Sequence, residues 1–318
     1  MRLAAVAFAA AMLACTDAPE ETATDSESTP VASAFSSDEA VTGTGLAGTL
    51  LTPSQARTDT LAIIVPSSGP TDRNGNGPMI STDAYRMLAE ALAESGVPSL
   101  RVDKRGMFGS SDAGDPNAVT LDVYRGDVAA WLETMDRDCA VLVGHSEGGT
   151  VALHSADLPG VCGVILLTSP GRRLSDVLRE QLSGPANRLV LGDTESIIAA
   201  LERGERVDTT DLKPALASLF REDVQDFLIS LFAVDPAEVA SELAVPLMVV
   251  GGGRDVQVGR ADYDALSPHA DEAVWLENMA HTLKSTNLLT MQKSYRDPTV
   301  PMAPELAGAV AEFILSVD

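Results

Sequence analysis

The chain has 318 residues, enough for one large domain with an insertion, and its 46 acidic and 22 basic residues give a formal net charge of −24. So acidic a protein repels nucleic acids and anionic lipid headgroups, and we expect no nucleic acid as a partner. The three cysteines and four histidines show no metal-site spacing, and no glycine-rich run fits a phosphate- or dinucleotide-binding loop, so we expect no metal and no cofactor.

The N-terminus has the features of an export signal. Arg2 precedes an apolar run over residues 3–14 that is too short to span a bilayer, and such a start is typical of a signal peptide. Ala14 stands directly before Cys15, which resembles the cleavage and acylation site of a bacterial lipoprotein. We therefore expect residues 1–14 to be removed and Cys15 to be lipidated, giving a periplasmic protein anchored to a membrane. An ordinary cleaved signal is the alternative.

The next segment is of low complexity. Residues 15–38 are rich in Ser, Thr, Ala and acids and have almost no aromatic side chains, which predicts a disordered tether. A single domain is then expected over residues 39–318. Within it, the apolar run 61–65 predicts a buried strand, and it leads into a loop of Pro, Ser and Gly over residues 66–70.

The most informative segment is Gly-His-Ser-Glu-Gly-Gly over residues 144–149. It follows an apolar run at 140–143 that predicts a strand, and it precedes a segment that reads as the start of a helix. A G-x-S-x-G between a strand and a helix is typical of a nucleophile elbow, in which the serine backbone is strained and its hydroxyl stands above the sheet. This pattern makes Ser146 the candidate nucleophile.

Residues 171–243 interrupt the alternation of strands and helices. Several segments there have helical spacing, which predicts a helical cap inserted after the sixth strand. Its apolar side chains would either line an acyl pocket or pack onto the core. Asp193 lies in this region and is the less favoured candidate for the catalytic carboxylate.

Two late apolar runs precede the other candidate catalytic residues. Residues 245–251 predict a strand that leads to Asp255, and residues 273–276 predict another that leads to His281. A nucleophilic serine needs a histidine base and an acid that orients it, and the chain order Ser, Asp, His is that of α/β-hydrolases.

The other three histidines fit the base role less well. His145 adjoins the serine, so its side chain should point away and pack beside the elbow. His154 falls two helical turns later, and His269 lies between the two late strands.

Together these segments resemble a bacterial α/β-hydrolase of the serine esterase/lipase/aminopeptidase group, in the subgroup whose elbow reads G-H-S-E-G-G. The resemblance runs from about residue 40 to residue 318. It includes blocks at 46–53, 68–76 and 101–106 and the loops that carry the candidate acid and base. It implies the α/β-hydrolase fold, with a mostly parallel central sheet flanked by helices and the helical cap described above.

The resemblance also implies a mechanism. Ser146 would attack an acyl carbonyl after His281 removes its proton, Asp255 would orient the imidazole, and water would then release the acid from the acyl-enzyme. The backbone N–H of Glu147 would supply one oxyanion donor. The second would come from Ser68, with Ser67 as the next choice.

Carboxylic esters of small or medium acyl groups are the favoured substrates, because an aromatic content of 4% offers little for the broad lid of a lipase. Aminopeptidase, thioesterase and acyltransferase activities on the same triad are alternatives, and a non-catalytic binding lipoprotein is the least favoured. An aminopeptidase would need an acidic group for the substrate amine. Glu147 is a candidate, although its side chain could instead cap the helix that follows.

The resemblance also bears on the remaining cysteines. Cys139 precedes the elbow strand and Cys162 precedes the next strand. In this fold those strands are adjacent and parallel, so their starts come within disulfide range, and an oxidising compartment permits the bond. We expect a disulfide, with two buried thiols as the alternative.

Overall fold

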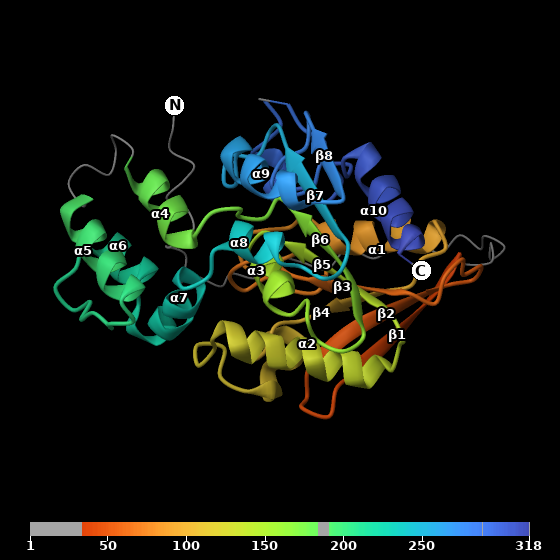
Figure 1. Ribbon diagram of the computed structural model, residues 1–318, viewed down its shortest axis with the longest axis horizontal. Coiled ribbons are helices and arrows are strands. Elements are labelled where there is room, and N and C mark those ends of the chain that lie inside the picture. The colour runs from red at the N-terminus through yellow and green to blue at the C-terminus, as the bar shows by residue number, and fades with distance from the viewer. Residues whose placement is uncertain (1–33, 184–190, 288, 318) are drawn as a thin grey trace, which may run out of the picture.

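The structure, a computed structural model, describes residues 34–183, 191–287 and 289–317 (Figure 1). The expected signal peptide and the expected lipidation site, Cys15, lie outside the described residues. Among the residues that are described, no helix is long and apolar enough to cross a membrane.

A mixed sheet forms the centre of the described molecule, with its strands in the order β1-β2-β4-β3-β5-β6-β7-β8. The first two strands in this order pair antiparallel with their neighbours, and all later pairs are parallel. The strands are β1 (Phe35–Val41), β2 (Ala47–Pro53), β3 (Leu61–Val65), β4 (Ser99–Val102), β5 (Ala140–His145), β6 (Val161–Leu167), β7 (Leu247–Gly252) and β8 (Glu272–Leu276).

Helices cover both faces of this sheet, which is why β3 and β5 read as continuous apolar runs and are buried along their whole length. The helices are α1 (Ala84–Glu94), α2 (Leu121–Met135), α3 (Glu147–His154), α4 (Leu174–Leu182), α5 (Leu191–Glu202), α6 (Pro214–Leu219), α7 (Gln225–Phe232), α8 (Pro236–Ser241), α9 (Arg260–Leu266) and α10 (Pro304–Ser316). Side chains of α1 and α10 pack in the core on one face, and those of α2, α3 and α9 pack on the other. The expected α/β-hydrolase fold is confirmed.

The cap lies between β6 and β7, as the sequence predicts. Helices α4 to α7 project to one side of the sheet in Figure 1, whereas α8 lies beside α3. The cap has a small core of its own, in which Phe220 and Phe232 are fully buried. Phe227 packs edge-on against Tyr124 of α2, with ring centroids 5.4 Å apart, and so joins the cap to the main core.

The start of the domain differs from the prediction. Residues 35–38 were expected to belong to the tether, but β1 begins at Phe35 and pairs along its length with β2. This edge strand is mostly exposed on both faces, so it carries no pattern of buried side chains. Backbone pairing with the neighbouring strand is what forms it.

A disulfide joins the starts of β5 and β6. Cys139 and Cys162 are bonded, with Cα atoms 5.3 Å apart, which lies within the usual range for a disulfide. The bond ties β5 to β6 at their N-terminal ends, whereas the G-x-S-x-G turn lies at the C-terminal end of β5.

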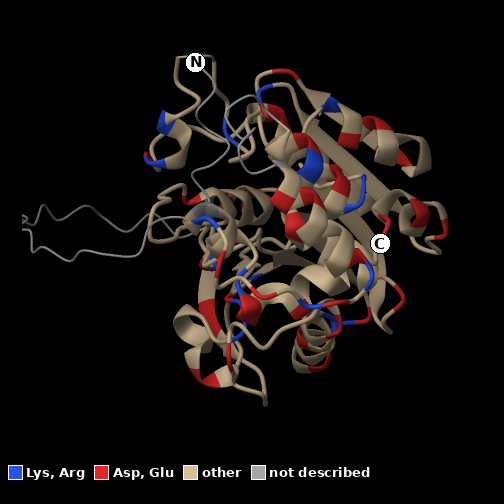
Figure 2. Ribbon diagram, turned by 90° about the vertical axis from the view of Figure 1, so that its left-hand side faces the viewer, with Lys and Arg blue, Asp and Glu red and all other residues tan. Residues whose placement is uncertain are grey.

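Charged residues are spread over the molecule. Figure 2, which faces the cap side, shows Asp and Glu (red) distributed over many helices and loops, with Lys and Arg (blue) among them. Within residues 34–183, 191–287 and 289–317, no group of three or more His, Cys, Asp or Glu residues is placed to hold a metal ion.

Candidate active site

Ser146 stands on a strained turn between β5 and α3. Its backbone has φ 54° and ψ −124°, a conformation that non-glycine residues rarely adopt. A Cβ on Gly144 would lie 2.4 Å from the carbonyl oxygen of Gly148, and a Cβ on Gly148 would lie 2.4 Å from the carbonyl oxygen of Val65. The turn therefore needs glycine at both flanking positions, which is the geometry expected of a nucleophile elbow.

Asp255 and His281 meet in the loops that follow β7 and β8. Oδ2 of Asp255 lies 2.7 Å from Nδ1 of His281, while its Oδ1 accepts hydrogen bonds from the backbone N–H groups of Gln257 and Val258 at 2.7 and 3.0 Å. The Asp255 side chain is fully buried, and that of His281 is 8% exposed. A carboxylate held in this way keeps the proton on Nδ1 and leaves Nε2 of His281 unprotonated, as a general base requires.

His281 lies beside the elbow. Its ring centroid is 5.0 Å from that of His145, the residue directly before Ser146. The Ser146 hydroxyl has no hydrogen-bond partner among the described residues. Catalytic hydrogen bonds of unliganded enzymes commonly form only when substrate binds.

The loop after β3 runs past the start of α3. Pro66 has no N–H, and the N–H of Ser67 donates to the hydroxyl of Tyr85 at 2.9 Å. In the described part of the chain no acceptor is bonded to the N–H of Ser68. Glu147 is the first residue of α3, so its N–H precedes the intrahelical hydrogen bonds. Two backbone N–H groups beside the elbow, those of Ser68 and Glu147, therefore remain available to bind an oxyanion.

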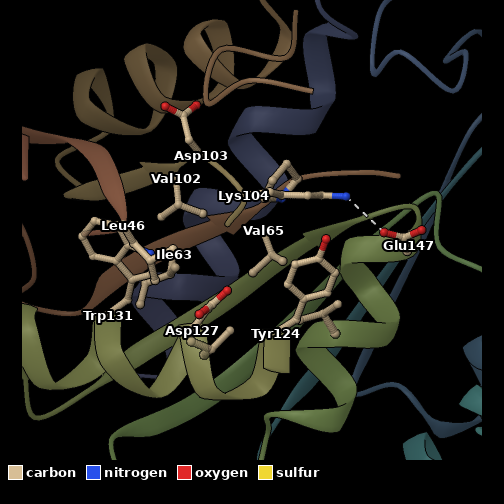
Figure 3. Close-up of a pocket in the computed structure, with 13 residues that line it drawn as sticks. Leu46, Ile63, Val65, Val102, Asp103, Lys104, Tyr124, Asp127, Trp131 and Glu147 are labelled. Atoms are coloured by element: carbon tan, nitrogen blue, oxygen red, sulfur yellow. Dashed lines mark hydrogen bonds and ion pairs between the residues drawn. The ribbon is translucent and has the colours of Figure 1, made fainter. Parts of the chain in front are cut away.

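The side chain of Glu147 pairs with Lys104. Its Oε1 lies 3.1 Å from Nζ of Lys104, with both side chains largely buried (Figure 3). Burial would lower the pKa of Lys104, but the charge and hydrogen bond of Glu147, together with the nearby hydroxyls of Tyr124 and Tyr85, raise that pKa above its usual value. The helix cap considered for Glu147 is not formed, because the carboxylate is held by the lysine after β4.

Two small cavities flank the elbow, each of about 40 Å³. One lies under the Lys104–Glu147 pair and has mostly apolar walls, which include Trp131 and Tyr124 (Figure 3). The other adjoins the candidate base. Most of its lining side chains are polar: Ser67, Ser68, Thr71, Thr82, Tyr85, His145, Gln257, His281, Thr282 and Tyr295.

A tyrosine that sequence reasoning did not find links the loops around the elbow. The Tyr85 hydroxyl lies 2.7 Å from Nδ1 of His145, and Nε2 of His145 donates to the carbonyl oxygen of His281 at 2.8 Å. Burial lowers the pKa of His145 to about 3. Burial also raises the pKa of Tyr85 to about 12. Tyr85 lies in α1, 60 residues before His145, and nothing in its local sequence separates it from an ordinary core residue.

Charged pairs brace the loops formed by the segments at 68–76 and 101–106. Asp103 accepts from Nε of Arg73 at 2.9 Å and from the backbone N–H of Arg73 at 2.7 Å. Arg105 pairs with Asp127 of α2. The first pair holds the loop after β3 against the loop after β4, and the second holds the loop after β4 against α2.

The less favoured candidates lie elsewhere. Asp193 is exposed in α5, His269 is exposed before β8, and His154 at the end of α3 bonds to Asp122 at 2.7 Å. The cap aromatic residues pack in the cores described above, and neither cavity beside the elbow is lined by them.

Comparison with known proteins identifies relatives. A sequence model described as the Alpha/beta hydrolase family matches residues 74–290. The chain is 24% identical over 246 residues to Esterase EstD of Thermotoga maritima, an alignment that covers 76% of this chain and 55% of the relative. The chain thus spans about half the length of that curated relative.

Solved structures have a similar backbone. An esterase of Pyrococcus furiosus matches with a TM-score of 0.54 and 17% identity over 88% of this chain and 90% of that one. A meta-cleavage product hydrolase of Pseudomonas fluorescens matches with a TM-score of 0.54 and 16% identity over 88% and 98%. A proline iminopeptidase of Mycobacterium smegmatis matches with a TM-score of 0.52 and 18% identity over 89% and 98%. At these identities the likeness shows the fold alone.

Proposed function

The chain belongs to the alpha/beta hydrolase family, and on this premise we propose that it hydrolyses carboxylic esters of small or medium acyl groups, with Ser146 as the nucleophile. The observation that carries the proposal is the 2.7 Å contact of Asp255 with Nδ1 of His281, in a loop that lies beside the strained Ser146 turn. Such an arrangement activates a serine, because an imidazole oriented by a carboxylate can remove the hydroxyl proton.

The reaction proceeds in two halves. Nε2 of His281 takes the Ser146 proton as Oγ attacks the ester carbonyl, and the negative charge that develops on the carbonyl oxygen is bound by the N–H groups of Glu147 and Ser68. The tetrahedral intermediate collapses, His281 returns its proton to the departing alcohol, and an acyl-enzyme remains. Water, deprotonated by the same imidazole, releases the acid and restores the serine.

The two oxyanion donors are supported by elimination. The N–H of Ser67, the other candidate in the loop after β3, already donates to Tyr85, whereas that of Ser68 has no acceptor in the described part of the chain. Glu147 follows the nucleophile directly, where the fold's other donor is expected.

The pairing of Glu147 with Lys104 favours esters over peptides with a free amino terminus as substrates. An aminopeptidase needs an unpaired carboxylate to bind the substrate ammonium group. The Glu147 carboxylate is already paired with Lys104 at 3.1 Å and largely buried. The esterase relative supports the same choice, although a proline iminopeptidase shares the backbone fold.

A substrate panel tests the proposal. Nitrophenyl esters with acyl chains of increasing length and aminoacyl nitroanilides would be offered to the signal-less protein and to Ser146→Ala. We expect cleavage of short and medium esters by the wild type alone. Faster cleavage of the anilides than of the esters would overturn the substrate class, and cleavage of esters by Ser146→Ala would overturn the nucleophile.

We further propose that the protein is exported and anchored through a lipid on Cys15. The Cys139–Cys162 disulfide supports export, since such bonds persist in oxidising compartments. Cells fed an alkyne fatty acid should label the wild type and not Cys15→Ser. Equal labelling of the two, or none in the wild type, would contradict the anchor.

A further inference from the structure

Four hydrogen-bonding groups form one continuous chain beneath the elbow. The N–H of Ser67 donates to the Tyr85 hydroxyl at 2.9 Å, that hydroxyl bonds to Nδ1 of His145 at 2.7 Å, and Nε2 of His145 bonds to the carbonyl oxygen of His281 at 2.8 Å. The chain starts next to the candidate oxyanion donor and ends on the backbone of the candidate base.

The partners allow only one arrangement of protons. The His281 carbonyl can only accept, so Nε2 of His145 carries a proton, and the neutral ring then has an unprotonated Nδ1. Nδ1 accepts the Tyr85 proton, and the tyrosine oxygen accepts the Ser67 N–H with a lone pair. Every donor meets an acceptor, and a second proton on His145 would break the chain.

Both side chains are well held. Tyr85 is 2% exposed and His145 is 5% exposed. The rings pack edge-on, with centroids 5.5 Å apart, and the His145 ring also contacts that of His281. Because Tyr85 of α1 packs in the core and both side chains are buried, the relay (Tyr85 with His145) cannot shift far without disturbing its neighbours.

We propose that the relay positions the oxyanion loop and the base on opposite sides of Ser146. The inference rests on the proposed function. The bond to the N–H of Ser67 fixes that residue and so sets the direction of the adjacent Ser68 N–H. The bond to the carbonyl of His281 fixes the backbone of that residue and so sets the position of its imidazole relative to Ser146. The two groups that must act on one reacting carbonyl are thereby kept at a constant separation. Tyr85 and His145 are positioning residues and do not touch the substrate.

Variants of the relay test this role. Tyr85→Phe removes the central hydroxyl and keeps the ring. His145→Leu removes both ring bonds, and His145→Gln keeps one donor and one acceptor at the end of a side chain of similar reach. His145→Leu is needed beside Tyr85→Phe because the polar cavity beside Tyr85 has room for a water molecule that would replace the lost hydroxyl. Tyr263→Phe, in α9 against Trp275, is the matched control.

We expect Tyr85→Phe and His145→Leu to lower kcat and the rate of fluorophosphonate labelling together by about 10-fold or more, within the ~100-fold that a 1 Å displacement of a reacting group can cost. KM should change little, His145→Gln should regain part of the rate, and Tyr263→Phe should match the wild type. Folded variants with wild-type kcat and labelling rate would overturn the proposal. So would a loss that appears only in KM, or only in resistance to urea.

A spectroscopic measurement does not depend on turnover. Nitrogen-15 spectra of the imidazoles should show His145 as the neutral Nε2–H tautomer from pH 8 to pH 5, and Tyr85→Phe should shift the Nδ1 signal of His145. A titrating His145, or the Nδ1–H tautomer, would overturn the relay even in an active enzyme. If the wild type is not labelled and does not cleave esters, both the proposed function and the positioning role are wrong. The tautomer of His145 would still show whether the hydrogen bonds of the relay exist.

Discussion

Oδ2 of Asp255 lies 2.7 Å from Nδ1 of His281, although the two residues are 26 positions apart. They meet because β7 and β8 are neighbouring parallel strands, and the loops that leave the same end of such strands lie side by side. Ser146 reaches the same edge of the sheet at the end of β5. The parallel topology therefore gathers three residues from three distant segments.

Asp255→Asn tests the orienting role of the carboxylate. The amide keeps the size of the side chain but can bond to His281 as a donor, which favours the tautomer with the proton on Nε2 and removes the base. We expect kcat for ester cleavage to fall by roughly 10³- to 10⁴-fold with little change in KM. Steady-state kinetics on a nitrophenyl ester measure this, and an activity within tenfold of the wild type would show that Asp255 does not orient the base.

The buried His145 makes folding stability depend on pH. Its pKa is lowered by burial to about 3 in the folded protein, against 6.5 for an ordinary histidine. Between these values the unfolded chain binds a proton that the folded protein does not, so this group costs stability as the pH falls below about 6.5, with a slope approaching ~1.4 kcal/mol per pH unit.

Urea unfolding at pH 7, 6 and 5 checks this slope. The wild type should lose more stability than His145→Gln over this range, because the glutamine cannot be protonated. Parallel pH curves for the two proteins would show that His145 is not held neutral in the fold.

The Lys104–Glu147 pair should behave as a buried ion pair. Lys104→Met leaves a carboxylate at the start of α3 without its partner, which costs about 3 kcal/mol of unfolding free energy. Adding Glu147→Gln removes the orphaned charge and should restore part of the stability. A double-mutant cycle by urea unfolding measures the coupling, and additive effects of the two substitutions would mean that the pair contributes nothing specific.

The Cys139–Cys162 bond closes a loop with a sequence separation of 23. On the chain-entropy model a loop of this size stabilises the fold by about 3 kcal/mol, so the double variant Cys139→Ser/Cys162→Ser should unfold at clearly lower urea concentration. Mass spectrometry of protein from the periplasm, alkylated without reductant, should find neither thiol modified. Alkylation of both would rule the bond out.

The sequence carried enough information to predict the strands that precede the three catalytic candidates, because each of these strands is an apolar run and its candidate follows within five residues. Side-chain partners were harder to predict. Sixty positions separate Tyr85 from His145, and 43 separate Lys104 from Glu147. Each contact forms only when whole helices and strands pack together. The early start of β1 was missed because a mostly exposed edge strand leaves no pattern of apolar side chains.

Labelling with a fluorophosphonate tests the central claim most directly, because this reagent bonds only to a serine whose proton is removed by a neighbouring base. The signal-less wild type should be labelled on Ser146, and both Ser146→Ala and His281→Ala should lose the label while remaining folded. A folded wild type that takes up no label, or a Ser146→Ala variant that labels as well as the wild type, would contradict the assignment of Ser146 as an activated nucleophile.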